Sequence, residues 1–509
     1  MADDKVVDQV DQDIARLESE ACDSDLKKTP EVLVDWTPEE ERKLVRKIDW
    51  RTIPYLSFVF GLSLLDRTNV SVAYIAGMSE DLDLAVGSRY SIALLFFFIP
   101  YMMCEIPSNM IIRRIGARWW LTVLILCWGV CILAMGFVKH WVPLVILRIL
   151  LGDFEAGLFP GALYILSAWY RTYESGQKVS IFYMASLVTT GFNGIFAYAL
   201  SRISVGNGMF SSGWRWIFII EGAVTIAAGV TGPFLLAEFP EKSTWLTERE
   251  RHIAIRRVVN DNAGRDYEHL NWKKQLKLLK DWKIAVYCLQ YYVVASSIYS
   301  LGYFLPLILR ESLGFSYTKA QLLFSPPYVC YVPPCPFSQL DSELQLIDRS
   351  QMFCIIMSIL SGWVSDRLRI RWIFLVVQAA IGIAGLFIIL FVHTPHVRYF
   401  GVFLGVWGIQ ANVPVTLAYC ANNAADPAKK GIISAAMITA GAIGGITGST
   451  IFRVQDAPRY LPGMGTTIAF QALYIVLTAG MSYYFKRKNK EADEKGTILE
   501  GVPGFRYAP

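Results

Sequence analysis

Charged side chains within two otherwise apolar stretches are the residues best suited to chemistry. One stretch contains Asp66, Arg67 and Asn69, and the other contains Arg148 and Glu155. A guanidinium stays charged and matches a carboxylate bidentately, whereas a buried carboxyl group can gain and lose a proton. Arg67 and Asn69 are therefore candidates for binding a carboxylate solute. The acids Asp66 and Glu155, together with Arg148, are candidates for coupling that solute to protons.

Helical spacing orders these candidates. Successive helix residues point about 100° apart, so Asp66 cannot easily neutralise Arg67, and another helix or a solute must supply the anion. Arg148 and Glu155 fall on one helix face, which favours Glu155 as the proton-coupling carboxylate. Structural alternatives remain open. For Asp66 and Arg67 the alternative is an ion pair that holds the helices together, and for Glu155 it is a contact with Arg148 near the cytoplasmic helix end.

Other polar residues in or beside apolar stretches form two further sets. Uncharged ones are candidates for reading an aromatic or amide-bearing solute, with packing as the equal alternative: Asn193, Gln290, Tyr291, Gln410 and Asn412. Charged ones near the ends of the stretches are candidates for a gating or structural role: Glu105, Arg114, Arg118, Glu221, Asp366 and Arg367.

No motif in the sequence indicates a metal or a cofactor. The nine cysteines and five histidines show no ligand spacing. No G-x-x-x-x-G-K-[ST] loop is present, which disfavours ATP-driven pumping. One apolar stretch carries four glycines: Gly441, Gly444, Gly445 and Gly448. They predict close helix packing and not a phosphate-binding loop, because no strand precedes them.

About a dozen apolar stretches must position these side chains. Each is about 20 residues long, enough for a helix to cross about 30 Å of hydrocarbon. Only 18% of the residues are charged, against about 25% in soluble domains, and the basic residues sit in short clusters, which disfavours nucleic-acid binding. The predicted spans are residues 52–76, 90–110, 119–138, 142–164, 179–202, 215–237, 284–308, 322–364 (interrupted), 372–392, 397–418, 430–452 and 466–485.

The predicted fold is an all-α polytopic membrane protein with twelve transmembrane helices in two six-helix halves. The segments are an N-terminal tail 1–51, a first half 52–240, a linker 241–283, a second half 284–485 and a C-terminal tail 486–509. The N-terminal tail lacks the apolar region of a cleaved signal peptide. In the linker, Thr247 and Glu250 are spaced to cap a short amphipathic helix. We expect this helix to lie at the membrane surface, with a regulatory or partner site as the alternative.

The eighth span is interrupted. Residues 331–353 carry several prolines and charges between two apolar flanks, 322–330 and 354–364, neither of which is long enough to span alone. Joined directly, the flanks would make one helix of about 20 residues. We interpret 331–353 as an in-frame insertion such as a retained intron, with a real extracellular loop as the alternative. Codons for these residues in cDNA would rule out the insertion.

Several motifs resemble the major facilitator superfamily. The run 105–118 resembles its loop between helices 2 and 3, although Asn109 and Arg113 replace a usual glycine and acid, and 362–371 repeats this motif in the second half. The run 148–161 resembles its fourth-helix motif. This resemblance implies a two-half transporter and no enzymatic activity.

Three further strings narrow the resemblance: 65–69, 119–121 and 213–222. Together they are similar to the anion:cation symporter branch, and within it to the fungal allantoate permease group, with a leaning toward nicotinate carriers. The resemblance implies proton-coupled symport of a small organic anion such as nicotinate, allantoate or pantothenate. It implies a monomer in the plasma membrane. An exporter of a secondary metabolite on the same fold is the alternative, and a non-transporting sensor is disfavoured by the short tail.

The loops predict the orientation of the chain. Lys and Arg gather before the first span and in the loop at 113–118, whereas the loop at 79–88 is acidic. The rule that cytoplasmic loops are rich in Lys and Arg then places both termini and the linker 241–283 in the cytoplasm.

A tag inserted in the linker 241–283 should therefore stay unlabelled by an impermeant reagent in intact cells and become labelled after permeabilisation. A tag in the loop 79–88 is the matched control and should be labelled in intact cells. Labelling of the linker in intact cells would overturn both the orientation and the six-plus-six arrangement.

Overall fold

The computed structural model describes residues 36–171, 174, 178–179, 181–183, 185–186, 189, 192–203, 209–262, 281–324, 371–424, 427–500 and 505–508. Residues 1–45 and 46–509 form two compact units, and the contacts discussed below lie within the second. The described residues contain helices and turns but no extended strands, so the predicted all-α fold is confirmed. The proposed insertion 331–353, Asp366 and Arg367 lie outside the described residues.

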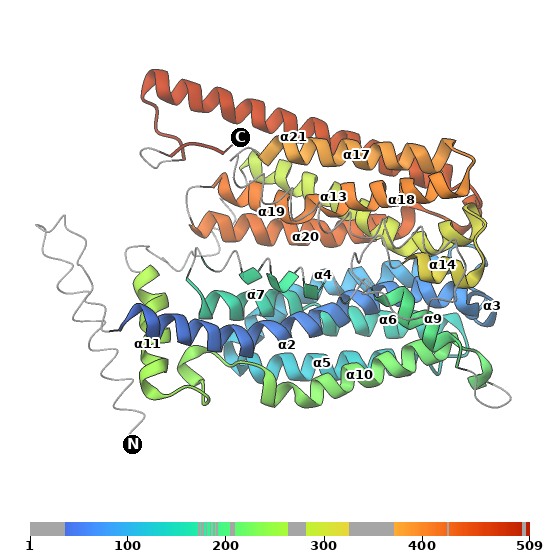
Figure 1. The fold of residues 1–509 in the computed structure, drawn as a ribbon, viewed down its shortest axis with the longest axis horizontal. Helices are drawn as coiled ribbons and strands as arrows, with labels where there is room; N and C mark the ends of the chain where they lie inside the picture. Colours follow the sequence, from blue (N-terminus) through green and yellow to red (C-terminus); the bar gives the residue numbers. More distant parts are fainter. Residues whose placement is uncertain are drawn as a thin grey trace, which may run out of the picture. The chain divides into compact units, whose positions relative to one another are not determined.

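The first half of the chain forms one group of helices (Figure 1). Its helices are α2 (Pro38–Ala73), α4 (Arg89–Ile115), α5 (Ala117–Met135), α6 (Trp141–Glu155), α7 (Leu158–Trp169), α9 (Asn193–Ser201) and α10 (Trp214–Leu235). The α5 and α10 backbones approach closely because small residues lie between them. A Cβ atom added at Gly222 would lie 2.4 Å from the Leu133 nitrogen, so only glycine permits this packing.

The second half forms a second group beside the first (Figure 1). Its helices are α13 (Trp282–Leu307), α14 (Tyr317–Phe324), α17 (Arg371–Phe391), α18 (Pro395–Gln410), α19 (Asn412–Asn422), α20 (Pro427–Ile451) and α21 (Leu461–Lys495). The glycine-rich helix α20 packs on α13. Added Cβ atoms at Gly444 and Gly448 would each lie 2.8 Å from a carbonyl oxygen of α13. The prediction that these glycines serve close packing is therefore confirmed.

Seven segments of the described residues are long and apolar enough to cross a membrane: Ala117–Met135, Trp214–Leu235, Trp282–Ser312, Arg371–Phe391, Pro395–Leu417, Ile432–Ile451 and Leu461–Lys495. Each overlaps one predicted span. Helix ends differ from the predicted ones. The helix α2 begins inside the predicted N-terminal tail, and α21 continues ten residues beyond residue 485, because hydropathy marks the apolar part of a helix and not its polar ends.

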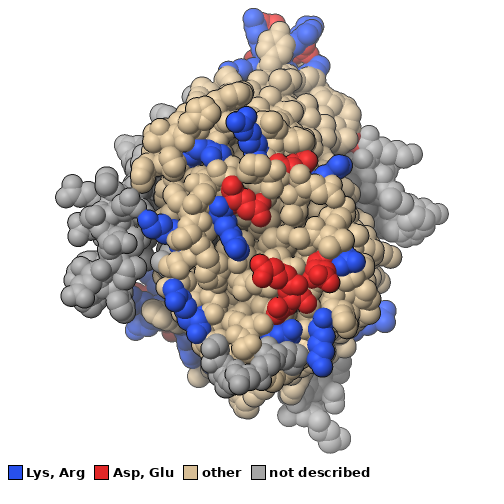
Figure 2. Space-filling model, turned by 90° about the vertical axis from the view of Figure 1, so that its right-hand side faces the viewer, with Lys and Arg blue, Asp and Glu red and all other residues tan. Residues whose placement is uncertain are grey.

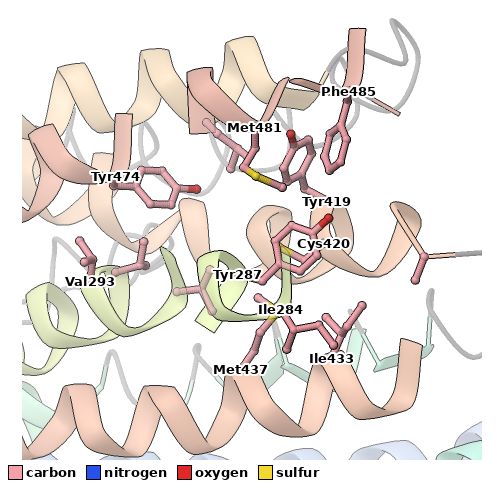
Figure 3. Close-up of a cluster of buried hydrophobic side chains, with 14 of the residues drawn as sticks. Ile284, Tyr287, Val293, Tyr419, Cys420, Ile433, Met437, Tyr474, Met481 and Phe485 are labelled. Atoms are coloured by element: carbon pink, nitrogen blue, oxygen red, sulfur yellow. The ribbon is translucent and has the colours of Figure 1, made fainter. Parts of the chain in front are cut away.

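The core of the second half is built where α13, α17, α19, α20 and α21 meet. Figure 3 shows Tyr287 of α13, Tyr419 and Cys420 of α19, and Tyr474 and Met481 of α21 pointing toward one another. Several polar atoms in this region are paired across helices, as in the bond between Thr416 Oγ1 and Tyr474 Oη at 2.6 Å. Such pairing allows polar groups to be buried in a membrane-spanning bundle.

The linker contains the helix α11 (Glu248–Asn262), and its predicted cap is confirmed. The Thr247 nitrogen donates to Glu250 at 3.0 Å, and the Glu250 nitrogen donates to Thr247 Oγ1 at 3.3 Å. Glu250 also pairs with Lys47 of α2 at 2.8 Å. The linker helix is therefore attached to the polar start of the first transmembrane helix.

The C-terminal tail closes onto the ends of α13 and α20 in a cluster that we name the tail clasp: Asp281, Lys283, Lys429, Glu500 and Tyr507. Lys429 pairs with Asp281 at 2.7 Å and with Glu500 at 2.6 Å, and Lys283 also pairs with Glu500. Tyr507 donates to Glu500 Oε1 at 2.7 Å. The tail clasp joins helices that are more than 100 residues apart in the chain.

Two asparagines hold the backbone of the same tail. Asn423 exchanges two hydrogen bonds with Ala508, at 3.0 and 2.8 Å. Asn489 exchanges two with Tyr507, at 2.8 and 2.9 Å. The tail after α21 is therefore a structural part of the second half.

Glu500 should make the stability of the second half depend on pH. Burial alone would raise its pKa, but hydrogen bonds from Lys283, Lys429 and Tyr507 outweigh burial and lower the pKa from 4.5 to about 2. Its contribution is therefore complete above pH 4.5 and is lost as the pH falls toward 2. Allowing for solvent screening, we expect Glu500→Gln to cost about 1 kcal/mol at pH 7.

The measurement is thermal unfolding of the purified protein between pH 7 and pH 3. The deficit of Glu500→Gln relative to the wild type should shrink toward acid pH. Glu491→Gln is the matched control, because Glu491 pairs only with Lys488 and Arg487 on its own helix. A deficit that does not change with pH would contradict the tail clasp.

Candidate functional site

The centre of the candidate site is an ion pair between α2 and α6. Arg67 Nε lies 2.5 Å from Glu155 Oε1, and Ser63 of α2 also donates to this oxygen. Both side chains are buried, Glu155 completely. The sequence left two sources of an anion for Arg67, another helix or a solute, and in this structure another helix supplies it.

Aromatic residues from both halves surround Arg67. Its guanidinium carbon lies 4.8 Å from the ring centre of Tyr101 and 5.4 Å from that of Phe97, both on α4. Arg67 Nη1 donates to the Tyr299 hydroxyl of α13 at 3.0 Å. Rings stacked on a desolvated cation contribute about 2 kcal/mol. Arg67 therefore links the two halves as well as α2 and α6.

Arg148 lies beside this pair but does not join it. It is fully buried, its Nε donates weakly to the Ala93 carbonyl at 3.4 Å, and its guanidinium lies 5.1 Å from the Phe97 ring centre. Its Nη1 and Nη2 have no hydrogen-bond partner among the described residues. A buried guanidinium with two unpartnered nitrogens can donate hydrogen bonds to an anion.

The alternative of a structural Arg148–Glu155 contact near the cytoplasmic helix end is wrong. The two residues are seven positions apart, which separates them by about 10 Å along a helix. Glu155 is bonded to Arg67 and Ser63 instead. It also ends α6 and is followed by α7 up to Trp169, so it lies midway along this fourth span.

Asp66 faces a different set of groups from its neighbour Arg67. It accepts hydrogen bonds from Trp128 Nε1 of α5 at 2.8 Å and from Asn69 Nδ2 at 3.1 Å. Asn69 Nδ2 also donates to Glu221 of α10. The alternative ion pair of Asp66 with Arg67 is therefore not formed, as the helical spacing predicted, and Asn69 is engaged inside the first half.

The remaining uncharged candidates contact protein groups or lie half-buried. Asn193 donates to Thr68 Oγ1 at 2.6 Å, which packs α9 on α2. Gln290 donates to Thr478 Oγ1 at 3.1 Å, and Asn412 donates to the Gly408 carbonyl at 3.0 Å. Tyr291 packs against Gly441, and Gln410 is half-buried.

The charged candidates at the helix ends separate into distinct environments. Glu105 is buried, and its Oε2 has no partner among the described residues. Arg114 is exposed. The nitrogens of Ala117 and Arg118 donate to Glu238 at 3.0 and 3.2 Å, so Glu238 caps the start of α5. Glu221 does not pair with the basic loop before α5, because it contacts Asn69 in the interior.

Sequence reasoning missed the residues that join the halves at one end. Tyr90 of α4 donates to the Tyr303 carbonyl at 2.9 Å, and Arg310 donates to the Ile75 carbonyl at 2.7 Å. Further contacts join Tyr317 to Ser201 at 2.7 Å and Arg202 to Thr318 at 3.3 Å. These contacts lie at the end opposite α11, where charges of both signs are scattered over a largely uncharged face (Figure 2). The aromatic residues of α13 at spacing four, Tyr299 and Tyr303, were the available signal.

Comparison with known proteins identifies the architecture. The sequence matches the family profile of the Major Facilitator Superfamily over residues 56–449. The chain belongs to the major facilitator superfamily. It is thus a multi-pass membrane protein of a family whose members transport small molecules across membranes.

Related sequences align with this chain over nearly its whole length. The MFS-type transporter cnsO of Penicillium expansum is 31% identical, with 92% of this chain and 90% of that protein aligned. The high-affinity nicotinic acid transporter of Saccharomyces cerevisiae is 26% identical, with 90% of this chain and 80% of that protein aligned. The fold is similar to an inward-facing, occupied bacterial homologue of the lysosomal transporter Spinster, with a TM-score of 0.61, 15% identity and coverage of 89% and 98%.

A small void lies within the second half of the chain, but it does not fit a solute. It measures about 10 Å³ and is lined by apolar residues that include Leu301, Leu386 and Val406. A void of this size is at the lower limit for one water, and it has no polar group to orient a solute. The void therefore offers no alternative to the candidate site at Arg67, Arg148 and Glu155.

The Arg67–Glu155 pair should behave as one unit in unfolding measurements. Arg67→Gln or Glu155→Gln alone leaves an unpaired buried charge and should destabilise the protein by about 3–5 kcal/mol. The double variant should cost clearly less than the sum of the two single changes, because it leaves no unpaired charge. Arg256→Gln, at an exposed arginine of α11, is the control and should have little effect. Additive costs in thermal unfolding would show that the two residues do not interact.

Proposed function

We propose that this chain takes up a small organic anion together with protons, as a monomer in the plasma membrane. The observation that carries the proposal is the buried guanidinium of Arg148 with two unpartnered nitrogens. An uncompensated buried cation costs several kcal/mol. An arriving carboxylate would remove that cost through a bidentate, charge-assisted contact. A neutral or cationic solute would not.

The neighbouring groups favour an anion with an aromatic or flat body. Arg67 and Arg148 contact the same Phe97 ring, so their guanidinium groups are neighbours. Tyr101 and Tyr299 add further ring surface beside Arg67. Aromatic surface beside a guanidinium suits a heteroaromatic carboxylate. The similarity to a transporter of nicotinic acid and the sequence resemblance to the allantoate permease group support this class.

Proton coupling follows from competition for Arg67. Glu155 contacts Arg67 in the structure. When Glu155 binds a proton, it no longer neutralises Arg67, and Arg67 becomes free to hold a carboxylate. A solute carboxylate and a proton therefore enter together, and the charge of the site does not change. Release of both to the cytoplasm restores the ion pair.

Uptake of labelled carboxylates, with nicotinate first, into cells lacking their own carriers tests the proposal. Arg148→Gln should lower uptake roughly 10- to 100-fold, the equivalent of one charge-assisted bond of about 1.5–3 kcal/mol. Glu155→Gln should abolish accumulation driven by an acid-outside gradient but retain exchange of solute, because an amide cannot cycle a proton. Arg256→Gln is the matched control at an exposed arginine.

Each variant must reach the membrane, as judged by a surface-labelled tag. Accumulation by Glu155→Gln equal to that of the wild type would remove Glu155 from the coupling. Unchanged uptake by Arg148→Gln would remove the anion site. Extrusion of preloaded anions, without uptake, would favour the exporter over the proposed importer.

A further inference from the structure

A second pair of buried acids lies apart from Arg67 and Glu155. Asp66 of α2 is 2% exposed and Glu221 of α10 is 6% exposed. The single nitrogen Asn69 Nδ2 donates to both, to Asp66 Oδ1 at 3.1 Å and to Glu221 Oε2. Two carboxyl groups that share one amide nitrogen must be close neighbours. We name Asp66, Asn69 and Glu221 the acid bridge.

No cation contacts the acid bridge. From α5, the neutral indole of Trp128 donates to Asp66 Oδ2 at 2.8 Å. On α10, the buried Arg215 donates to the Gly136 and Val138 carbonyls. The buried cations of α2 and α6 are Arg67 and Arg148. Arg67 is paired with Glu155, and Arg148 Nε donates to the Ala93 carbonyl. Within the described residues, neither guanidinium lies within ion-pair distance of Asp66 or Glu221.

Two oxygens of the acid bridge lack a donor. Glu221 Oε1 and Asn69 Oδ1 are buried without a hydrogen-bond partner among the described residues. Thr225, one turn further along α10, also has a buried hydroxyl without a partner. A hydrogen on Glu221 Oε1 would add one donor where two acceptors are unsatisfied. These two unpartnered oxygens therefore indicate an additional hydrogen atom on Glu221 Oε1.

Charge balance leads to the same assignment. Two ionised carboxylates that share one amide nitrogen, with only neutral donors beside them, would repel each other strongly, and such pairs share one proton. The buried groups around Arg67 are the carboxyl groups of Asp66, Glu105, Glu155 and Glu221 and the guanidinium groups of Arg67 and Arg148. Acids outnumber cations in this set, which favours the binding of a proton.

We propose that Asp66 and Glu221 together bind one proton, as a carboxyl–carboxylate pair bridged by Asn69. The proton comes from water, converts one carboxylate to a carboxylic acid, and returns to water when it leaves; no other bond changes. The site is distinct from Glu155, whose proton competes with Arg67. The inference deepens the proton coupling of the proposed function, and its role in transport rests on that function.

Infrared difference spectroscopy of the purified full-length protein tests the proton without any solute. At pH 7, the spectrum of the wild type minus that of Glu221→Gln should contain a positive carbonyl band of a buried, protonated carboxylic acid, because the variant lacks this band. Asp66→Asn should shift or remove the same band, and Glu155→Gln should leave it in place. A difference spectrum that contains only ionised carboxylate bands would overturn the proposal.

A second measurement keeps the test valid if one variant folds poorly. Because the native protein would hold a proton that the unfolded chain releases near neutral pH, the thermal midpoint of the wild type should fall from pH 6 to pH 9. The midpoints of Glu221→Gln and of Asp66→Asn should fall less steeply. Equal slopes for the wild type and both variants would contradict the bound proton.

The two proposals fail in different ways. If the carboxylic acid band is present but no carboxylate is taken up, the acid bridge stands and the proposed solute class is wrong. If uptake is driven by protons but the band is absent, the transport proposal stands and the acid bridge is wrong.

Discussion

The interaction on which this structure depends is the buried contact between Arg67 and Glu155. A charge within a hydrocarbon-spanning bundle is stable only when an opposite charge or several donors neutralise it. The contact therefore determines how α2 sits against α6. Through Tyr299 it also places α13 of the second half against the first. Any solute that binds Arg67 must replace Glu155, so the same contact connects stability with transport.

Hydropathy and local spacing predicted what depends on neighbours in the sequence. Seven of the predicted apolar spans, the cap of α11 by Thr247 and Glu250, and the packing glycines of α20 follow from local patterns, and the described residues contain them. The choice of partners was not predictable. Asn69 and Glu221 are 152 residues apart, and helix periodicity gives the face of a side chain but not the helix that it meets. Periodicity placed Arg148 and Glu155 on one face, yet two helical turns are too long for an ion pair.

The contacts at the two ends of the molecule differ. At the end that contains α11, Glu250 and Lys47 tie the linker to α2, and the tail clasp ties α13 to α20. These contacts join helices within a half or to the linker. At the opposite end, Tyr90, Arg310 and Tyr317 bond the two halves to each other. Among the described residues, the halves are thus braced separately at one end and joined at the other, an arrangement suited to rocking about the joined end.

Electroneutrality explains why two acid sites are more useful than one. With a single acid at Arg67, protonation would leave two uncompensated guanidinium groups until the solute arrived, a costly intermediate in a dry interior. The acid bridge shares the turn of α2 that carries Arg67, because Asp66 precedes Arg67 directly in the chain. A negative charge released there when its proton leaves would offset part of the positive charge exposed at Arg67. The order Asp66–Arg67–Asn69 thus places an anion source, a cation and a neutral bridging donor within four residues of one helix, and each faces a different neighbour.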